Sequence, residues 1–357
     1  MSADRVDPTV SRRRVLGSAA VLAGAAAGAA ELLTHRNAEA APASIAASPP
    51  AGFVPMAAPG RIVKVSKSDV MMPNGLFPKE EAARTMLERA MTELTGETDL
   101  AKAFARFVHK DDKVAIKMNG IAGQTGGTMA TNKELILPIV AGVIAAGVPA
   151  SNIVVYEQYT SFFNGTRVSA KNLPAGVVTA VHGNKDATMP EIRVLNIPTK
   201  FVRQLTEATA VINVALIKDH SICGYTGCLK NMTHGSTINP HDFHQHNASP
   251  QIAALYSQDV MKSRVRLHIT DGFKLIYDGG PLDKNPDRRV GHGSVYVTTD
   301  PVAMDTIGWN EVEKWRADKK LPTLAKAGRE PSYIRIAGEL GLGVADKEQI
   351  RMREVTL

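Results

Sequence analysis

Short runs of β-branched and aliphatic residues alternate with longer amphipathic stretches from about residue 61 to the C-terminus. This alternation predicts an α/β fold in a single large domain, with a mostly parallel or mixed sheet and crossover helices. Strands are expected at Arg61–Val65, Lys113–Met118, Asn152–Glu157, Ala210–Ile217, Arg264–Thr270 and Ser294–Thr298. Helices are expected at Lys79–Leu94, Leu100–His109, Asn132–Ala146, Pro250–Ser263, Pro301–Lys319 and Tyr333–Leu340.

Two of the expected helices carry signals for where they begin. Thr131 and Glu134 have the spacing of a capping box. Asp300 before Pro301 is typical of an N-cap followed by proline at the first helical position. The segment 160–200 has no readable period, so we expect an insertion with short irregular strands.

The first 60 residues are expected to lie outside this domain. Residues 11–16 read Ser-Arg-Arg-Arg-Val-Leu and precede an Ala/Gly-rich apolar stretch, which is typical of a twin-arginine signal peptide spanning residues 1–40. Cleavage is expected after Ala40. The alternative is a transmembrane anchor, although alanine and glycine make the stretch weakly hydrophobic. Residues 41–60, rich in Ala, Pro and Ser, are expected to be a linker, and residues 61–357 the domain.

The N-terminal segment also predicts partners and a compartment. We expect contact with the twin-arginine export machinery, no stable membrane span after cleavage, and a periplasmic or extracellular location. The net charge of +7 is spread along the chain and favours small anionic ligands. Aromatic residues make up only 5% of the chain and no nucleic-acid-binding motif is present, so we expect no nucleic-acid partner.

Polar residues follow four of the expected strands at the point where each ends. They are Lys117 to Gly120, Glu157 with Gln158, Lys218 to His220, and Asp271 with Gly272. If these strands are parallel, all four groups lie at the carboxyl edge of the sheet, where open α/β folds bind ligands. The glycine-rich loop 119–128 lies at the same edge, and its backbone amides could contact an anion.

One window of 27 residues, 220–246, contains five of the ten histidines and both cysteines. One interpretation is a transition-metal site for iron, copper or zinc, with His220, Cys223, Cys228 and His234 as ligands. A second is a Cys223–Cys228 disulfide beside unrelated histidines. A third is a ligand crevice in which His220 and Lys230 act as acid, base or anion-binding groups. Two cysteines cannot supply a four-cysteine iron–sulfur cluster, and His241, His244 and His246 are expected in a loop that could close over the site.

These residues resemble the domain-of-unknown-function 362 family, an α/β family in which some members also carry a ferredoxin module. The resemblance rests on Val114 to Asn119, Val211 to His220, Thr226 to Asn231, Ile269 to Gly272 with Gly279 to Pro281, and Asp300 to Asp305. This chain lacks the ferredoxin cysteines. The resemblance implies the fold and the site location but no reaction. It places Lys117, Asn119, Lys218, His220, Lys230, Asn231, Asp271 and Asp305 at motif positions.

Two hypotheses of function follow. In the first, the chain is a metal-dependent oxidoreductase or hydrolase, with Lys230 and Asp271 as catalytic residues and Lys117, Asn119, Lys218 and Asn231 binding the ligand. In the second, it is a periplasmic binding or accessory protein for a small anionic molecule, with a structural disulfide and no catalysis.

Overall fold

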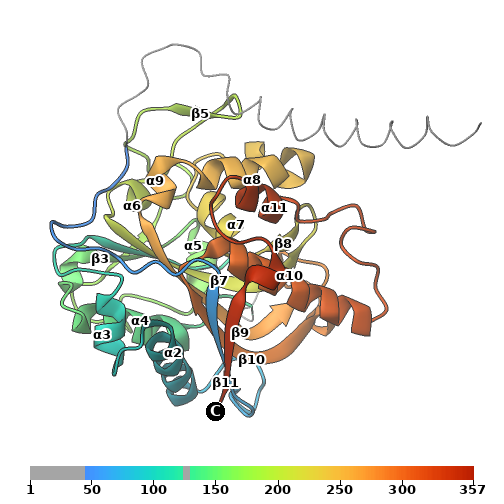
Figure 1. Cartoon of the computed structure of the whole chain (residues 1–357), viewed down its shortest axis with the longest axis horizontal. Helices are drawn as coiled ribbons and strands as arrows, with labels where there is room; N and C mark the ends of the chain where they lie inside the picture. The colour runs from blue at the N-terminus through green and yellow to red at the C-terminus, as the bar shows by residue number, and fades with distance from the viewer. Residues whose placement is uncertain (1–44, 124–128) are drawn as a thin grey trace, which may run out of the picture. The chain divides into compact units, whose positions relative to one another are not determined.

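A nine-stranded mixed sheet forms the centre of the computed structural model, which describes residues 45–123 and 129–357 (Figure 1). The strand order is β11-β1-β10-β9-β7-β2-β3-β4, and β8 pairs with β7. The α/β class predicted from the sequence is confirmed. The strands are β1 (Arg61–Ser66), β2 (Val114–Lys117), β3 (Ile153–Glu157), β4 (Val178–Val181), β7 (Ala210–His220), β8 (Gly224–Thr226), β9 (Val265–Ile276), β10 (Arg289–Thr298) and β11 (Arg351–Thr356). A separate two-stranded ribbon consists of β5 (Ile192–Val194) and β6 (Ile197–Thr199).

Helices cover both faces of the sheet because the strands carry apolar side chains on both sides. In β7, for example, Val211 belongs to one hydrophobic core, whereas Ala210 and Ile212 belong to the other. One core includes α2 (Glu80–Thr95), α3 (Leu100–Ala105) and α4 (Lys133–Ala145). The other includes α7 (Cys228–Thr233), α8 (Ser249–Tyr256), α9 (Asp259–Lys262), α10 (Pro301–Asp318) and α11 (Tyr333–Glu339). Short helices α5 (Thr160–Gly165) and α6 (Arg203–Thr206) complete the fold.

All six predicted strands are present, but β7, β9 and β10 are several residues longer than predicted, and β10 begins at Arg289. β7 extends to His220, and β9 runs to Ile276, so Asp271 lies inside its strand. The predicted helix at residues 250–263 is two helices, α8 and α9. The irregular segment 160–200 adds β4 to the main sheet, and the sequence analysis did not predict β11. Both additions lack a long apolar run, which is the signal that identified the other strands.

The two predicted helix starts had different outcomes. Asp300 is the N-cap of α10, and its side chain accepts from the amide of Ala303 at 2.9 Å. The capping box predicted at Thr131 is wrong, since the N-cap of α4 is Asn132. The hydroxyl of Thr131 contacts Asn119 instead, accepting from its amide at 2.6 Å and donating to its carbonyl at 2.9 Å. Thr131 therefore ties the end of β2 to the start of α4.

The compact unit begins at Ile45, earlier than the predicted boundary at residue 61. Residues 45–60, assigned above to the linker, contact the domain through backbone hydrogen bonds. Met56 donates to the carbonyl of Arg106 at 2.8 Å, and Gly60 donates to Asp300 at 2.8 Å. Composition indicated a flexible segment but could not reveal these contacts. The predicted signal peptide, residues 1–40, lies outside the described residues.

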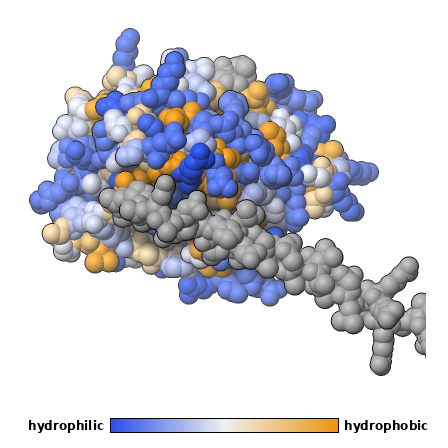
Figure 2. All heavy atoms as spheres, turned by 90° about the horizontal axis from the view of Figure 1, so that it is seen from above, coloured by the Kyte–Doolittle hydropathy of each residue, from blue (hydrophilic) through white to orange (hydrophobic). Residues whose placement is uncertain are grey.

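The surface seen from above carries mainly hydrophilic residues with small apolar patches between them (Figure 2). Within the described residues, every helix is too short or too polar to cross a bilayer.

Replacing Asp112 should cost much of the stability. Asp112 is fully buried, pairs with Arg266 at 2.7 Å and accepts from Thr209 at 2.6 Å. Asp112→Asn would leave the buried Arg266 without its carboxylate, which typically costs about 3–5 kcal/mol. Urea denaturation should show this loss. Glu81→Gln, which breaks an exposed pair with Arg84, should cost less than about 1 kcal/mol. Equal losses in the two variants would contradict the prediction.

Candidate functional site

The carboxyl ends of parallel strands meet at one edge of the sheet, as the sequence predicted. β2 pairs in parallel with both β3 and β7, and β7 pairs in parallel with β9. Lys117 therefore lies opposite Tyr156 of β3 and Asn213 of β7. The register brings the polar residues that close β2, β3 and β7 close together, and nearly all of them are buried.

A neighbouring carboxylate compensates the charge of Lys117. The lysine forms an ion pair with Glu157, the last residue of β3. Its ammonium group also donates to the carbonyl of Met118 at 2.6 Å. Gly235 makes room for this side chain, since a Cβ there would lie 2.6 Å from Cε of Lys117. The sequence analysis placed Glu157 at a strand end but gave it no role.

Lys218 is fully buried in β7, and its ammonium group donates to Oδ1 of Asn119 at 2.7 Å. A chain of amides fixes that oxygen: Asn119 donates to Asn231 at 3.0 Å, and Asn231 donates to Asn213 at 2.7 Å. Within residues 45–123 and 129–357, Lys218 forms no ion pair. Burial lowers the pKa of Lys218 well below its usual value, against the opposing effect of the nearby Glu157, and Lys230 lowers it further.

Lys230 comes from α7, and its ammonium group donates to Nε2 of His244 at 3.2 Å. His244 donates from Nδ1 to the carbonyl of Pro240 at 2.8 Å, so its Nε2 is the acceptor. Burial lowers the pKa of Lys230. Burial and the neighbouring Lys230 together lower the pKa of His244 to about 4, which keeps the ring neutral at pH 7. In the described part of the chain, Lys230 also lacks a carboxylate partner.

Two further histidines border the lysines with defined ring tautomers. Nδ1 of His220 accepts from two backbone amides of the following turn, at 3.1 and 3.3 Å, so Nε2 carries the hydrogen. His234 donates from Nε2 to the carbonyl of Phe243 at 3.2 Å, and its Nδ1 lies 3.1 Å from the hydroxyl of Thr233. Burial lowers the pKa of both rings well below the usual value. Both are neutral hydrogen-bond donors at pH 7.

The four residues predicted to bind a metal do not meet as one ligand set. Among the residues described, no group of three or more His, Cys, Asp or Glu side chains could hold a metal ion. The thiol of Cys223 donates to the carbonyl of Tyr225 at 3.1 Å. The thiol of Cys228 lies 3.7 Å from the hydroxyl of Thr270. The ring nitrogens of His234 are engaged as well, so metal binding at these residues stays a prediction.

The alternative disulfide between Cys223 and Cys228 is absent, because both cysteines are free and buried. Their spacing would permit a bridge, but Cys223 precedes β8 whereas Cys228 begins α7, and their thiols contact different groups. Burial raises the pKa of Cys223 to about 11 and that of Cys228 well above its usual value. Both thiols are therefore protonated at pH 7.

Asp271, predicted to be catalytic, contacts the start of α4. Its carboxylate accepts from the backbone amide of Asn132 at 2.7 Å and from the side-chain amide of the same residue at 2.9 Å. Burial raises the pKa of Asp271 to about 6. Its hydrogen bonds thus hold the start of α4 rather than a lysine of the site.

Asp305 fixes the helix that carries Lys230. Its carboxylate accepts from the backbone amides of Cys228 at 2.5 Å and Leu229 at 3.1 Å, in the first turn of α7. Its own helix, α10, is a separate element of the same core. Burial raises the pKa of Asp305 to about 7. The sequence placed Asp305 at a motif position without a role, and the structure supplies one.

A second anchor comes from near the C-terminus. Arg329 forms an ion pair with Asp219 and donates to the carbonyl of His220 at 2.9 Å. Burial raises the pKa of Asp219 to about 6, against the opposing effect of Arg329. No periodicity or motif in the sequence connects Arg329 with Asp219, so this ion pair could not be predicted.

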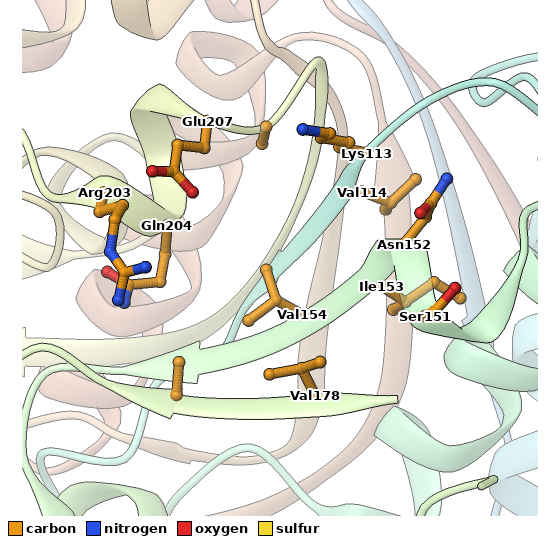
Figure 3. A pocket seen from close by; sticks show the side chains of 12 residues that line it. Lys113, Val114, Ser151, Asn152, Ile153, Val154, Val178, Arg203, Gln204 and Glu207 are labelled. Atoms are coloured by element: carbon orange, nitrogen blue, oxygen red, sulfur yellow. The ribbon is translucent and has the colours of Figure 1, made fainter. Parts of the chain in front are cut away.

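One pocket of the described structure lies away from these lysines. A cavity of about 300 Å³ is lined by residues at the amino ends of β2 and β3, including Lys113 and Ile153, together with Arg203 of α6 (Figure 3). Because it lies at the start of these strands, it is at the opposite edge of the sheet from the lysines. It is not part of the candidate site.

Fold and site together define an α/β protein with a buried cluster of lysines and neutral histidines at the carboxyl edge of a mixed sheet. The family described as Domain of unknown function (DUF362) matches residues 114–310, more than half of the chain. The chain belongs to this family. No curated protein matches it.

The raised pKa of Asp305 predicts how the stability of the protein changes with pH. A buried aspartate with a pKa of about 7 binds a proton more tightly in the folded chain than in the unfolded one. Its contribution to stability is therefore full at about pH 4 and is lost as the pH rises to about 7. Asp305→Asn removes the titration.

The measurement is urea unfolding of both proteins at several pH values. The free energy of unfolding of the wild type, relative to Asp305→Asn, should fall by at most about 4 kcal/mol between pH 4 and pH 7, at about 1.4 kcal/mol per pKa unit. A difference that stays constant, or that rises with pH, would contradict a raised pKa of Asp305.

Proposed function

We propose that this protein binds a small anionic molecule at the carboxyl edge of its sheet, with Lys218 and Lys230 as the principal binding groups. One observation carries the proposal: both ammonium groups are buried, and neither forms an ion pair within the described residues. An isolated buried ammonium loses its hydration without compensation, so a buried lysine either loses its proton or takes a counter-ion. Burial lowers the pKa of both Lys218 and Lys230 accordingly. A bound anion would supply the missing partner.

The surrounding groups suit an anion rather than a cation. Lys117 adds a third ammonium to the cluster, and Glu157 is the carboxylate that compensates it. The neutral ring of His220 presents an N–H donor at Nε2, and the side-chain amide of Asn119 orients Lys218. Phosphate and carboxylate oxygens accept such bonds, and charge-assisted bonds of this kind are among the strongest in proteins. The ligand class is therefore a small phosphorylated or carboxylated molecule.

The metal hypothesis is the second candidate. It draws support from four imidazoles that lie close together: the ring of His244 has its centre 5.7 Å from that of His220, 4.6 Å from that of His234 and 6.2 Å from that of His241. The lysines count against it, since nearby ammonium groups repel a cation. Export by the twin-arginine machinery to the periplasm remains part of the proposal, on the evidence of residues 11–16 alone.

Anion binding is tested by comparing Lys230→Met with the wild type. Without ligand, the variant should be more stable by about 1–4 kcal/mol, because a buried unpaired cation is replaced by an apolar group of similar length. Inorganic phosphate or malonate should raise the melting temperature of the wild type but not that of Lys230→Met. Thermal unfolding in chloride at equal ionic strength controls for screening.

Lys113→Met is the matched control, because Lys113 is exposed at the other end of β2. Its stability should change by less than about 0.5 kcal/mol, and its response to phosphate should equal that of the wild type. If phosphate and malonate stabilise Lys230→Met as much as the wild type, the anion does not bind at Lys230 and the proposal fails.

Elemental analysis of protein purified without chelator tests the metal hypothesis. Under our proposal, His220→Ala and His234→Ala should leave the iron, copper and zinc content unchanged. Stoichiometric metal in the wild type that is lost in both variants would replace the anion proposal with the metal site.

A further inference from the structure

The candidate site is closed, so a ligand can reach it only if part of the chain moves. Lys218 is 0% exposed and Lys230 is 7% exposed. The segment Pro240–Ala248, here called the capping segment, covers Lys230 through His244. His244 occupies a hydrogen-bonding position on the Lys230 ammonium group that an anion could take.

The end of the capping segment is strained. His246, Asn247 and Ala248 have φ angles of 50°, 57° and 56°, which is the left-handed region. Residues other than glycine enter this region at a steric cost and usually singly, so three in succession are exceptional. Backbone strain of this kind persists only where surrounding contacts impose it, and it concentrates at sites that switch or bind ligands.

Contacts divide the capping segment into a fixed part and a weakly held part. Phe243 is fully buried, and its carbonyl accepts from His234 at 3.2 Å. Beyond it, His246 and Asn247 are exposed. The side chain of Asn247 donates to the carbonyl of Gly328 at 3.1 Å. The two exposed strained residues are thus held chiefly from the buried Phe243 and the buried Ala248 on either side, and release would lower the cost of their conformation.

We infer that the capping segment is a gate for the anion: it opens at His246–Ala248, moves His244 away from Lys230, and lets the anion take that place. This inference rests on the proposed function, because it assumes that the ligand binds Lys230. The exchange conserves hydrogen bonds, since the anion replaces the imidazole nitrogen as the acceptor. Because the closed form carries backbone strain, the free-energy difference between the closed and open forms is reduced.

Two substitutions at the exposed His246 distinguish the effect of backbone strain from the effect of the imidazole side chain. Glycine adopts a φ of 50° without steric cost, so His246→Gly should stabilise the closed form. Hydrogen exchange of the amides in residues 243–248 should then slow several-fold, as should phosphate association followed by phosphorus NMR. His246→Ala removes the imidazole but keeps the strain, and it should behave like the wild type in both measurements.

Two results would overturn the gate. The first is phosphate association at the same rate in His246→Gly, His246→Ala and the wild type. The second is exchange of the capping segment only through global unfolding, at the rate of the neighbouring α8, which requires no phosphate to detect. If phosphate does not bind at all while the exchange rates change as expected, the gate stands and the choice of phosphate as ligand fails.

Discussion

The structure around the site depends on the burial of positive charge. Three lysine amino groups, those of Lys117, Lys218 and Lys230, lie out of water at one edge of the sheet. Among residues 45–123 and 129–357, Glu157 is the carboxylate that forms an ion pair with one of them, Lys117. The polar side chains around these amino groups compensate for the hydration that the lysines lose on burial. Asn119 accepts from Lys218, and neutral imidazoles replace the water that would otherwise surround Lys230. An apolar core could not hold these groups, so this edge of the sheet is polar throughout.

The polar edge of the sheet could be predicted from the sequence because the features that identify it lie close together in the chain. Each strand is a short apolar run, and in parallel strands the residues that end such runs share one edge. Lys117, Asn119 and Lys218 are brought together for that reason, and a hydrogen bond connects the last two. Asp300 was identified as a helix cap for the same reason, since its cap hydrogen bond joins it to Ala303 only three residues away. Asn231 reaches Asn119 from α7, and the family resemblance rather than a strand end singled it out.

What the sequence did not predict are pairings over long distances in the chain. Asp271 stood at a predicted strand end, but β9 continues beyond it and its carboxylate contacts Asn132. Cys223 and Cys228 are close in sequence, yet a strand and a helix turn their thiols toward different neighbours. Burial also determines the protonation of these side chains, and composition carries no information about burial at a single position. The fold was therefore predictable in outline, and the role of each side chain was not.

The contacts of Asp305 have a consequence for the order in which the protein is made. The first turn of α7, which carries Lys230, is held by a carboxylate 76 and 77 residues later in the chain. Arg329, which holds the end of β7, is 110 residues beyond its partner and lies outside the segment that matches the family. During synthesis, Lys218 and Lys230 are therefore made long before Asp305 and Arg329, which hold the elements that carry them. The site is completed only after Asp305 and Arg329 have been made, and a chain cut short before residue 305 could not hold it.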